Sequence, residues 1–376
     1  MTTPDAPTVT TEWSIPRGLI ILLGGAGIFV VMFGLQSFQG IVGPTFLALM
    51  LVITMVPLQH WMIRKHWPRW LAITTMVLGA YAILVSLGLV LLYAGAKFAS
   101  LVAENAPSGD AITKDAQNFL SNLGIGQKQI DAATGSLSPQ NVATLVTDVL
   151  SSLSSVAGSL FLVLAVIIFL GLDSLGFTDR LRYTAKSRPD ISDAMSNFAS
   201  GTRTYLAVST IFGGIVAVID TIALYIMGIP APILWGFVAF VTNYIPNIGF
   251  VIGVIPPAVL GLLVGGWKLA ILVVVVYSVI NFLIQSIIQP KFVGDSVNLA
   301  TTVTFLSMAI WTLTIGPLGA LLAVPLTLLT KAILIDLDPS TRWIGTLLGS
   351  TTPSEDDDAP PGQEPITPAI VDQSDE

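Results

Sequence analysis

Residues 232–264 read PILWGFVAFVTNYIPNIGFVIGVIPPAVLGLLV, an apolar run of more than 30 residues that Pro246, Asn247 and Gly249 interrupt near its middle. A straight helix of that length would measure about 50 Å, whereas about 20 residues are enough to cross the hydrocarbon core of a bilayer. A broken helix at membrane depth is tolerated only where its freed backbone groups face protein or a water-filled cavity. The run therefore predicts a membrane protein that is built around an interrupted span.

A second apolar run of more than 30 residues, 301–334, is broken in the same way by Gly316, Pro317 and Gly319. The sequence GALLAVP at this break is similar to GFVIGVIP at the first break. Paired segments that Gly and Pro interrupt at matching places point to the binding site of a transporter with an inverted repeat. Two kinked but ordinary helices are the alternative. Kinked spans predict eight crossings in all, whereas two re-entrant hairpins that enter from opposite faces predict six.

The composition and the other apolar runs agree with a chain that crosses the membrane several times. Only 10% of the residues are charged and 53% are hydrophobic, whereas soluble domains are about 25% charged. Further apolar runs lie at residues 18–34, 41–58, 71–93, 160–172, 206–228 and 269–288. We therefore predict an all-α polytopic membrane protein with about eight hydrophobic segments, surrounded by the lipid bilayer.

The basic residues indicate how the chain is oriented in the membrane. Arg64, Lys65 and Arg69 lie in one short loop between predicted spans, and five further bases lie within residues 180–203. The positive-inside rule places both loops, and with them both termini, in the cytoplasm. Lys268 is cytoplasmic if there are eight crossings and external if there are six.

The acidic residues gather in the C-terminal tail. Eight of the 23 acidic residues lie after residue 350, where there is no Lys or Arg, so the net charge of −7 belongs to the tail. Such a tail buries too little apolar surface to fold and is predicted to be disordered. The nearly neutral body has no basic stripe, which argues against a nucleic-acid partner. Because the chain has no Cys and two His, we expect no disulfide, metal site or cofactor.

These patterns divide the chain into five segments. They are a cytoplasmic N-terminal tail (1–14), the first three transmembrane helices (15–98), an extracytoplasmic helical segment (99–152), a transport core with the broken helices (153–346) and a disordered acidic tail (347–376). The external segment contains amphipathic pieces such as ITKDAQNFLSNL at residues 112–123, which we expect to pack on the membrane domain or on a neighbouring subunit.

Asp220 is the only acidic residue inside a predicted span. Burying a carboxylate in the bilayer costs roughly 2.5 to 3.5 kcal/mol on insertion scales, so it should face the bundle. It shares one helix face with Ser209, Gly213 and Ala217, a face of small residues that suits close helix packing. Two interpretations remain open: a site for a proton or a cation, and a protonated side chain held by one interhelical hydrogen bond.

Three polar side chains recur every four residues in a later span: Tyr277, Asn281 and Gln285. This spacing places them on one face of a helix that is otherwise rich in Val and Ile. They either line a substrate pathway or form interhelical hydrogen bonds that fix the fold. Donors and acceptors are also present at the first break, on Thr242, Asn243, Tyr244 and Asn247, whereas the second break has almost none.

The C-terminal half carries a family likeness. Its motifs are GIP at 228–230, NYIPNIG at 243–249, IPP at 255–257, QPKFVG at 289–294 and GPLGALLAVPL at 316–326. In this order they resemble the autoinducer-2 exporter family of PerM-like permeases, and the hydropathy plan of residues 15–345 is similar too. The resemblance implies a bacterial inner-membrane transporter, with relatives linked to export of a small signalling molecule or to sodium/proton exchange. It also implies a homo-oligomer, with a pentamer as one candidate.

The sequence therefore predicts a secondary transporter or exporter of a small solute or ion, not an enzyme. There is no ATPase motif, so a proton or sodium gradient would supply the energy, unless the protein is a facilitator. The predicted pathway is lined by Asp220, Asn243, Pro246, Asn247, Gly249, Tyr277, Asn281, Gln285, Gly316, Pro317 and Gly319. A non-transporting membrane scaffold is the main alternative. An intramembrane protease would need two carboxylates or a Ser/His pair at depth, and a single Asp stands against it.

Overall fold

The computed structural model describes residues 16–105, 162–174, 176–246, 248–289 and 299–338, together with a few positions between 341 and 349. Within these ranges the chain forms helices and no strand. Four of the described helices are long and apolar enough to cross a membrane, and a bent pair, Leu162–Ser174 and Gly176–Ala185, raises the number to five. The all-α polytopic class is confirmed. Most of the predicted external segment and the acidic tail lie outside the described residues.

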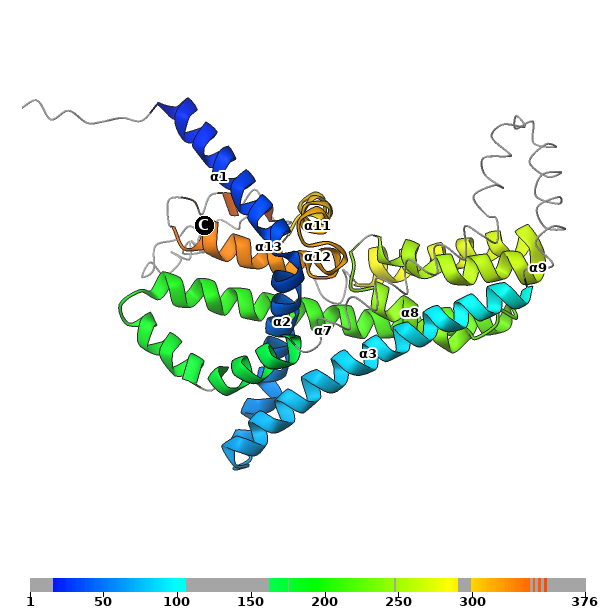
Figure 1. Ribbon diagram of the computed structural model, residues 1–376, viewed down its shortest axis with the longest axis horizontal. Helices are drawn as coiled ribbons and strands as arrows, with labels where there is room; N and C mark the ends of the chain where they lie inside the picture. The colour runs from blue at the N-terminus through cyan, green and yellow to red at the C-terminus, as the bar shows by residue number, and fades with distance from the viewer. Residues whose placement is uncertain are drawn as a thin grey trace, which may run out of the picture.

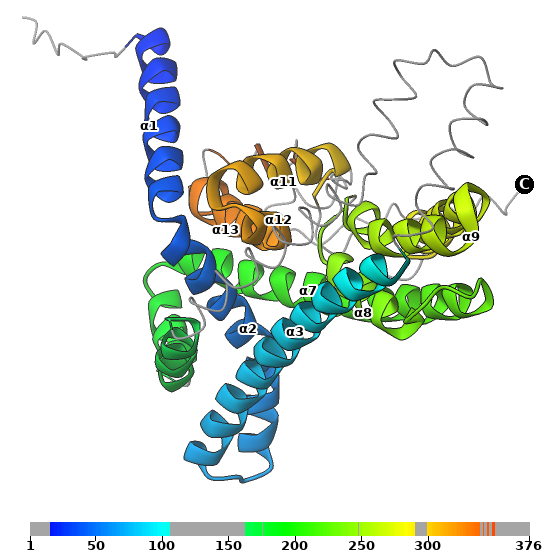
Figure 2. The ribbon, with the colours of Figure 1, turned by 45° about the vertical axis from the view of Figure 1, so that its right-hand side comes forward.

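The first three helices are α1 (Arg17–Ser37), α2 (Gln39–Arg64) and α3 (Arg69–Asn105). Figures 1 and 2 both show α1 standing away from the other helices along most of its length, while α2 and α3 meet at the turn that joins them. Small side chains in the core between α2 and α3, such as Ala48 and Ala80, let these helices approach closely. At 37 residues, α3 is much longer than the predicted span 71–93.

The longest helix, α7 (Pro189–Ile226), runs through the middle of the molecule (Figure 1). It begins with Pro189 in its first turn, where a missing N–H leaves no hydrogen bond unmade. Its buried positions recur at helical spacing from Ala194 to Leu224. It packs against α2, α8, α9 and α13, so it is the helix that the broken segments share.

At the first break, α8 (Pro232–Thr242) and α9 (Gly249–Asn281) form an antiparallel hairpin. Gly249 lies against the carbonyl of Thr242, and Gly253 lies against Ala239, so the two limbs pair outward from the break. With 11 residues, α8 spans only about 16 Å and cannot cross the hydrocarbon core alone. The predicted hairpin is present here, rather than a kinked span.

The chain reverses again inside α9, at Gly266. This glycine has φ 73° and ψ −174°, a conformation that is strained for residues with a side chain. Gly261 packs against Ala270 and against Ile229, which follows α7. The Gly266 turn therefore lies at the C-terminal end of α7, and the helix after it continues as a π-helix, η2 (Phe282–Ile288).

The second break also produces a hairpin. Its limbs are α11 (Thr301–Ile315) and the short helices α12 (Pro317–Leu321) and α13 (Ala323–Lys331), which continue as the π-helix η3 (Ala332–Asp336). Gly319 lies against the carbonyl of Trp311, and Trp311 Nε1 donates to Thr327 Oγ1 over 3.1 Å. Both broken runs therefore fold back on themselves instead of forming single kinked helices.

The position of the Gly266 turn gives a labelling prediction. Because the chain has no native Cys, Lys268→Cys introduces a single thiol beside this turn. We expect an impermeant thiol reagent to reach it in intact cells, from the side opposite to Lys65→Cys in the α2–α3 turn. Labelling of Lys268→Cys only after permeabilisation would contradict the hairpin arrangement.

Close packing of α8 on α7 gives a stability prediction. A Cβ added at Gly236 would meet Thr221 Oγ1 and would lie 2.8 Å from the carbonyl oxygen of Ala217. Overpacking of this kind typically costs about 1–3 kcal/mol, so Gly236→Ala should lower the free energy of unfolding by that order. Thermal unfolding in detergent measures the effect. Gly214→Ala is the matched control, because nothing lies within 4 Å of its added Cβ, and it should leave stability unchanged or raised.

Candidate functional site

The centre of the candidate site is Asp220, which lies on α7 and is 0% exposed. It faces the interior of the bundle, together with Ser209 and Gly213, as its position on the small-residue face predicts. Neither of its carboxylate oxygens has a hydrogen-bond partner within the part of the chain that the structure describes. Asp220 therefore makes no interhelical hydrogen bond with these residues, which was one of the two interpretations of its position.

A second buried polar residue, Tyr277, lies on α9, a helix that packs against α7. Tyr277 is also 0% exposed, sits on the helix that follows the Gly266 turn, and interacts electrostatically with Asp220. Its hydroxyl oxygen likewise has no partner among the described residues. A buried polar group without a partner usually costs about 1–3 kcal/mol of stability. Two such groups, on Asp220 and Tyr277, therefore indicate a functional role in addition to packing.

A chain of amide groups continues from Tyr277 towards the first break. Asn281 Nδ2 donates to the Tyr277 carbonyl over 2.9 Å, and Gln285 Nε2 donates to Asn281 Oδ1 over 3.0 Å and to Asn243 Oδ1 over 2.6 Å. Asn243 Nδ2 in turn donates to the Ser209 carbonyl of α7 over 3.4 Å. These bonds connect α7, the first break and η2 in one line of polar groups, called the amide chain below.

Two local features hold the amide chain in place. Gly213 leaves room for Asn243, because a Cβ there would lie 2.8 Å from Asn243 Nδ2. Gln285 lies in the π-helix η2, whose extra residue per turn changes the face that a side chain occupies. Short π-helical turns within α-helices occur frequently at functional sites.

Sequence reasoning left out of the predicted site the residues that anchor the first break to α7. The hydroxyl of Tyr205 donates to the Tyr244 carbonyl over 2.7 Å, and Thr210 Oγ1 lies 2.6 Å from the Tyr244 hydroxyl. A detectable signal existed, since Tyr205 and Ser209 are four residues apart and extend the face that carries Asp220. Their bonds satisfy polar groups that the break would otherwise leave free.

The predicted site residues fall into two groups. The structure brings Asp220, Tyr277, Asn281, Gln285 and Asn243 together along the α7–α9 contact. Gly249 and Pro246 belong to the break beside Asn243, while Asn247 lies outside the described residues.

The second break lies elsewhere and is not part of the amide chain. Gly43 of α2 packs against Ile315 and Leu318, and Gln36 Nε2 donates to the Leu313 carbonyl over 3.4 Å. Gly316, Pro317 and Gly319 therefore face the junction of α1 and α2. No hydrogen bond among the described residues connects them with Asp220 or with the amide chain. The prediction that both breaks line one pathway gains no support from this placement.

The arrangement defines a class of protein. Two helical hairpins broken by Gly and Pro, with buried polar groups beside one of them, are typical of secondary transporters, in which interrupted helices surround the site for substrate and coupling ion. A family model described as AI-2E family transporter matches residues 19–338. The chain belongs to this family, and the resemblance noted from its motifs is confirmed.

The names of similar proteins support the same class. The AI-2 transport protein TqsA of Escherichia coli is 29% identical over 83% of this chain and 90% of its own length. The putative transport protein YhhT of Escherichia coli is 30% identical over 84% and 90%. A putative transport protein of Haemophilus influenzae is 28% identical over 87% and 95%. This protein is accordingly a multi-pass membrane transporter, and its relatives carry the names of transport proteins rather than enzymes.

The amide chain gives a prediction about coupling between residues. Gln285→Leu would leave Asn243 Oδ1 and Asn281 Oδ1 without their donor, which should lower the free energy of unfolding by about 1–3 kcal/mol. Asn243→Leu should cost a similar amount, and the double variant should cost clearly less than the sum of the two. Thermal unfolding of the four proteins completes the cycle.

Ser278→Ala is the control for this cycle. Ser278 is half-buried, and among the described residues its hydroxyl donates to the Val274 carbonyl of its own helix, so its loss should have little effect. Additive costs for Gln285→Leu and Asn243→Leu would show that the two amides do not act as a unit.

Proposed function

We propose that this protein is a secondary transporter of the bacterial inner membrane that exports a small solute and couples its movement to a proton or sodium gradient at Asp220. The family and the names of its relatives support the class of transporter. The unpartnered carboxylate beside the amide chain supports the coupling site.

The buried pair of Asp220 and Tyr277 carries the proposal. An ionised carboxylate without a partner is unstable in apolar surroundings, so Asp220 must be either the neutral acid or paired with a cation. The two states tolerate different surroundings: the neutral acid can stay packed against α9, and the ionised form requires water or a cation. Binding and release of a cation at Asp220 would thereby favour different positions of α7 relative to α9.

The amide chain supplies a polar route along the same contact. Asn281, Gln285 and Asn243 offer donors and acceptors where the neighbouring side chains are apolar, and such groups can replace the hydration of a polar solute. The route runs from Tyr277 on α9 to the Ser209 carbonyl on α7.

Orientation in the membrane and assembly belong to the proposal as well. The α2–α3 turn and the segment Gly176–Ala185 hold the basic loops predicted to be cytoplasmic, and residues from both line a single cleft. This convergence supports cytoplasmic termini. The homo-oligomer implied by the family resemblance is retained here, and the exposed apolar side chains of α1, such as Phe29 and Phe33, offer a surface for it.

The test is transport in sealed proteoliposomes. The name of TqsA makes AI-2 the first solute to assay. We expect wild-type protein to move AI-2 in response to an imposed proton or sodium gradient, and Asp220→Asn to reduce this flux to the level of protein-free liposomes, because an amide cannot bind and release the cation. A pH-sensitive dye inside the vesicles distinguishes the proton from sodium.

Two further variants sharpen this test. Asp220→Glu keeps the carboxylate and should retain part of the gradient dependence, whereas Ser278→Ala, next to Tyr277 in sequence and outside the amide chain, should transport as wild type. Unchanged gradient-dependent flux in Asp220→Asn would falsify a coupling role for this residue.

A further inference from the structure

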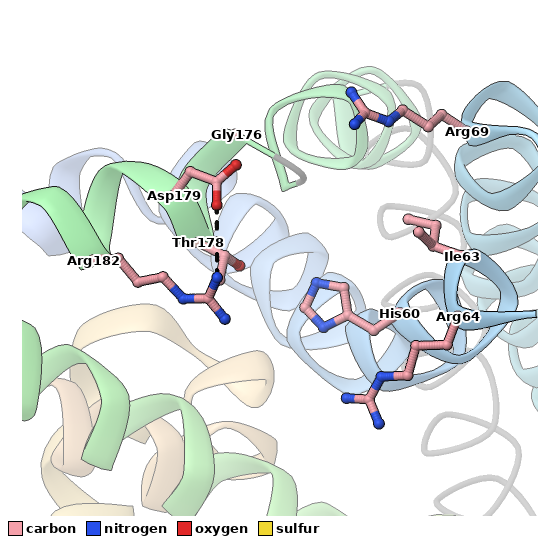
Figure 3. A pocket seen from close by; sticks show the side chains of 8 residues that line it. All are labelled: His60, Ile63, Arg64, Arg69, Gly176, Thr178, Asp179 and Arg182. Atoms are coloured by element: carbon pink, nitrogen blue, oxygen red, sulfur yellow. Dashed lines mark ion pairs between the residues drawn. The ribbon is translucent and has the colours of Figure 1, made fainter. Parts of the chain in front are cut away.

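A second feature lies far along α7 from Asp220, where the two basic loops meet. A cleft of about 370 Å³ is lined by His60, Ile63, Arg64, Arg69, Gly176, Thr178, Asp179 and Arg182. Figure 3 shows His60, Ile63 and Arg64 on one helix and Asp179 and Arg182 on another, with Arg69 approaching the same space from a third direction. The cleft thus joins the end of α2, the start of α3 and the segment Gly176–Ala185.

Positive charge dominates this cleft. The lining contains three arginines, Arg64, Arg69 and Arg182, and one carboxylate, Asp179, whose Oδ1 lies 3.9 Å from Arg182 Nη1. Both partners of this ion pair are about 80% exposed, so it neutralises little of the charge. Arg203 of α7 adds a further positive charge, because it interacts electrostatically with His60 together with Arg64 and Arg182.

The cleft lies at the level of the membrane surface. Arg64 is the last residue of α2 and Arg69 the first of α3, and both helices are long and apolar enough to span the bilayer. Trp61, Trp67 and Trp70 next to the cleft are 54%, 46% and 67% exposed. Exposed tryptophans at the ends of spans lie at the depth of the lipid headgroups.

We propose that this cleft binds the phosphate group of an anionic phospholipid. Guanidinium groups bind phosphate through paired, charge-assisted hydrogen bonds, and three of them converge here from three segments. Basic pockets between spans at the membrane surface bind lipid headgroups, whose acyl chains can lie along the apolar exteriors of α2 and α3. A free phosphate ion offers the same chemistry but would not use the tryptophans or the depth of the site.

Lipid binding would connect parts of the chain that otherwise make few polar contacts. Ser174 Oγ, before the bend, donates to Gln59 Oε1 of α2 over 2.9 Å, and Gln59 Nε2 has no partner among the described residues. A bound headgroup would contact arginines of both α2 and the segment Gly176–Ala185 and so connect them. The lipid therefore stabilises the bend between the two helices as well as the end of α2.

Native mass spectrometry of the whole protein tests the site. We expect wild type to retain phosphatidylglycerol in preference to phosphatidylcholine. Arg64→Gln combined with Arg182→Gln should weaken phosphatidylglycerol retention about 30-fold, because each substitution removes from the cleft a guanidinium group that would bind the phosphate. Lys65→Gln combined with Lys186→Gln, a pair of exposed bases outside the cleft lining, is the matched control and should retain the lipid.

A variant with the opposite effect keeps the test independent of folding. Asp179→Asn removes the only carboxylate in the lining and should strengthen phosphatidylglycerol retention. Equal losses in the two double variants, or no gain in Asp179→Asn, would overturn the site. Displacement of the lipid by millimolar inorganic phosphate, with the same thermal stabilisation, would assign the cleft to a soluble phosphate and overturn the lipid as its occupant.

Discussion

Inside a bilayer there is no water to satisfy a free peptide group, and this constraint decides how the two broken runs fold. A single long helix could not accommodate the glycines and prolines at 246–249 and 316–319 without exposing backbone to lipid. When each run folds back into a hairpin, its two limbs pack against each other beside the break, so the backbone there faces protein instead of lipid. Gly249 against Thr242 and Gly319 against Trp311 show the same solution at both sites.

The hairpins differ in what they surround. The first has polar side chains at its break, and these join Ser209 and Gln285 in the amide chain. The second has almost no polar side chain at its break and packs on α2 through Gly43. The two hairpins therefore have similar backbones but different side chains at their breaks. The proposed transport site lies beside the first hairpin. This explains why the carboxylate and the amides gather on α7 and α9 rather than between the breaks.

Much of this arrangement could be predicted from the sequence, since helical periodicity and breaks are local. Spacing by four placed Tyr277, Asn281 and Gln285 on one face, and the isolated charge of Asp220 required a buried position. The turn at Gly266 falls between the predicted apolar segments 232–264 and 269–288, so its position could be predicted from their boundaries. The amide chain and the Tyr205–Tyr244 bond depend on which helices meet, which is information that no single segment contains. Convergence of the arginines around one cleft is likewise a property of tertiary packing.

The length of α3 has a mechanical consequence. From Arg69 at the cleft to Phe98, which meets Trp235 of α8 edge to face at 5.8 Å between ring centres, the helix is continuous and free of proline. At 1.5 Å per residue this distance is about 44 Å. Such a helix is a stiff lever arm with one end among the headgroups and the other against the first hairpin. A tilt of a few degrees at the membrane surface therefore shifts the packing of Trp235 by several ångströms.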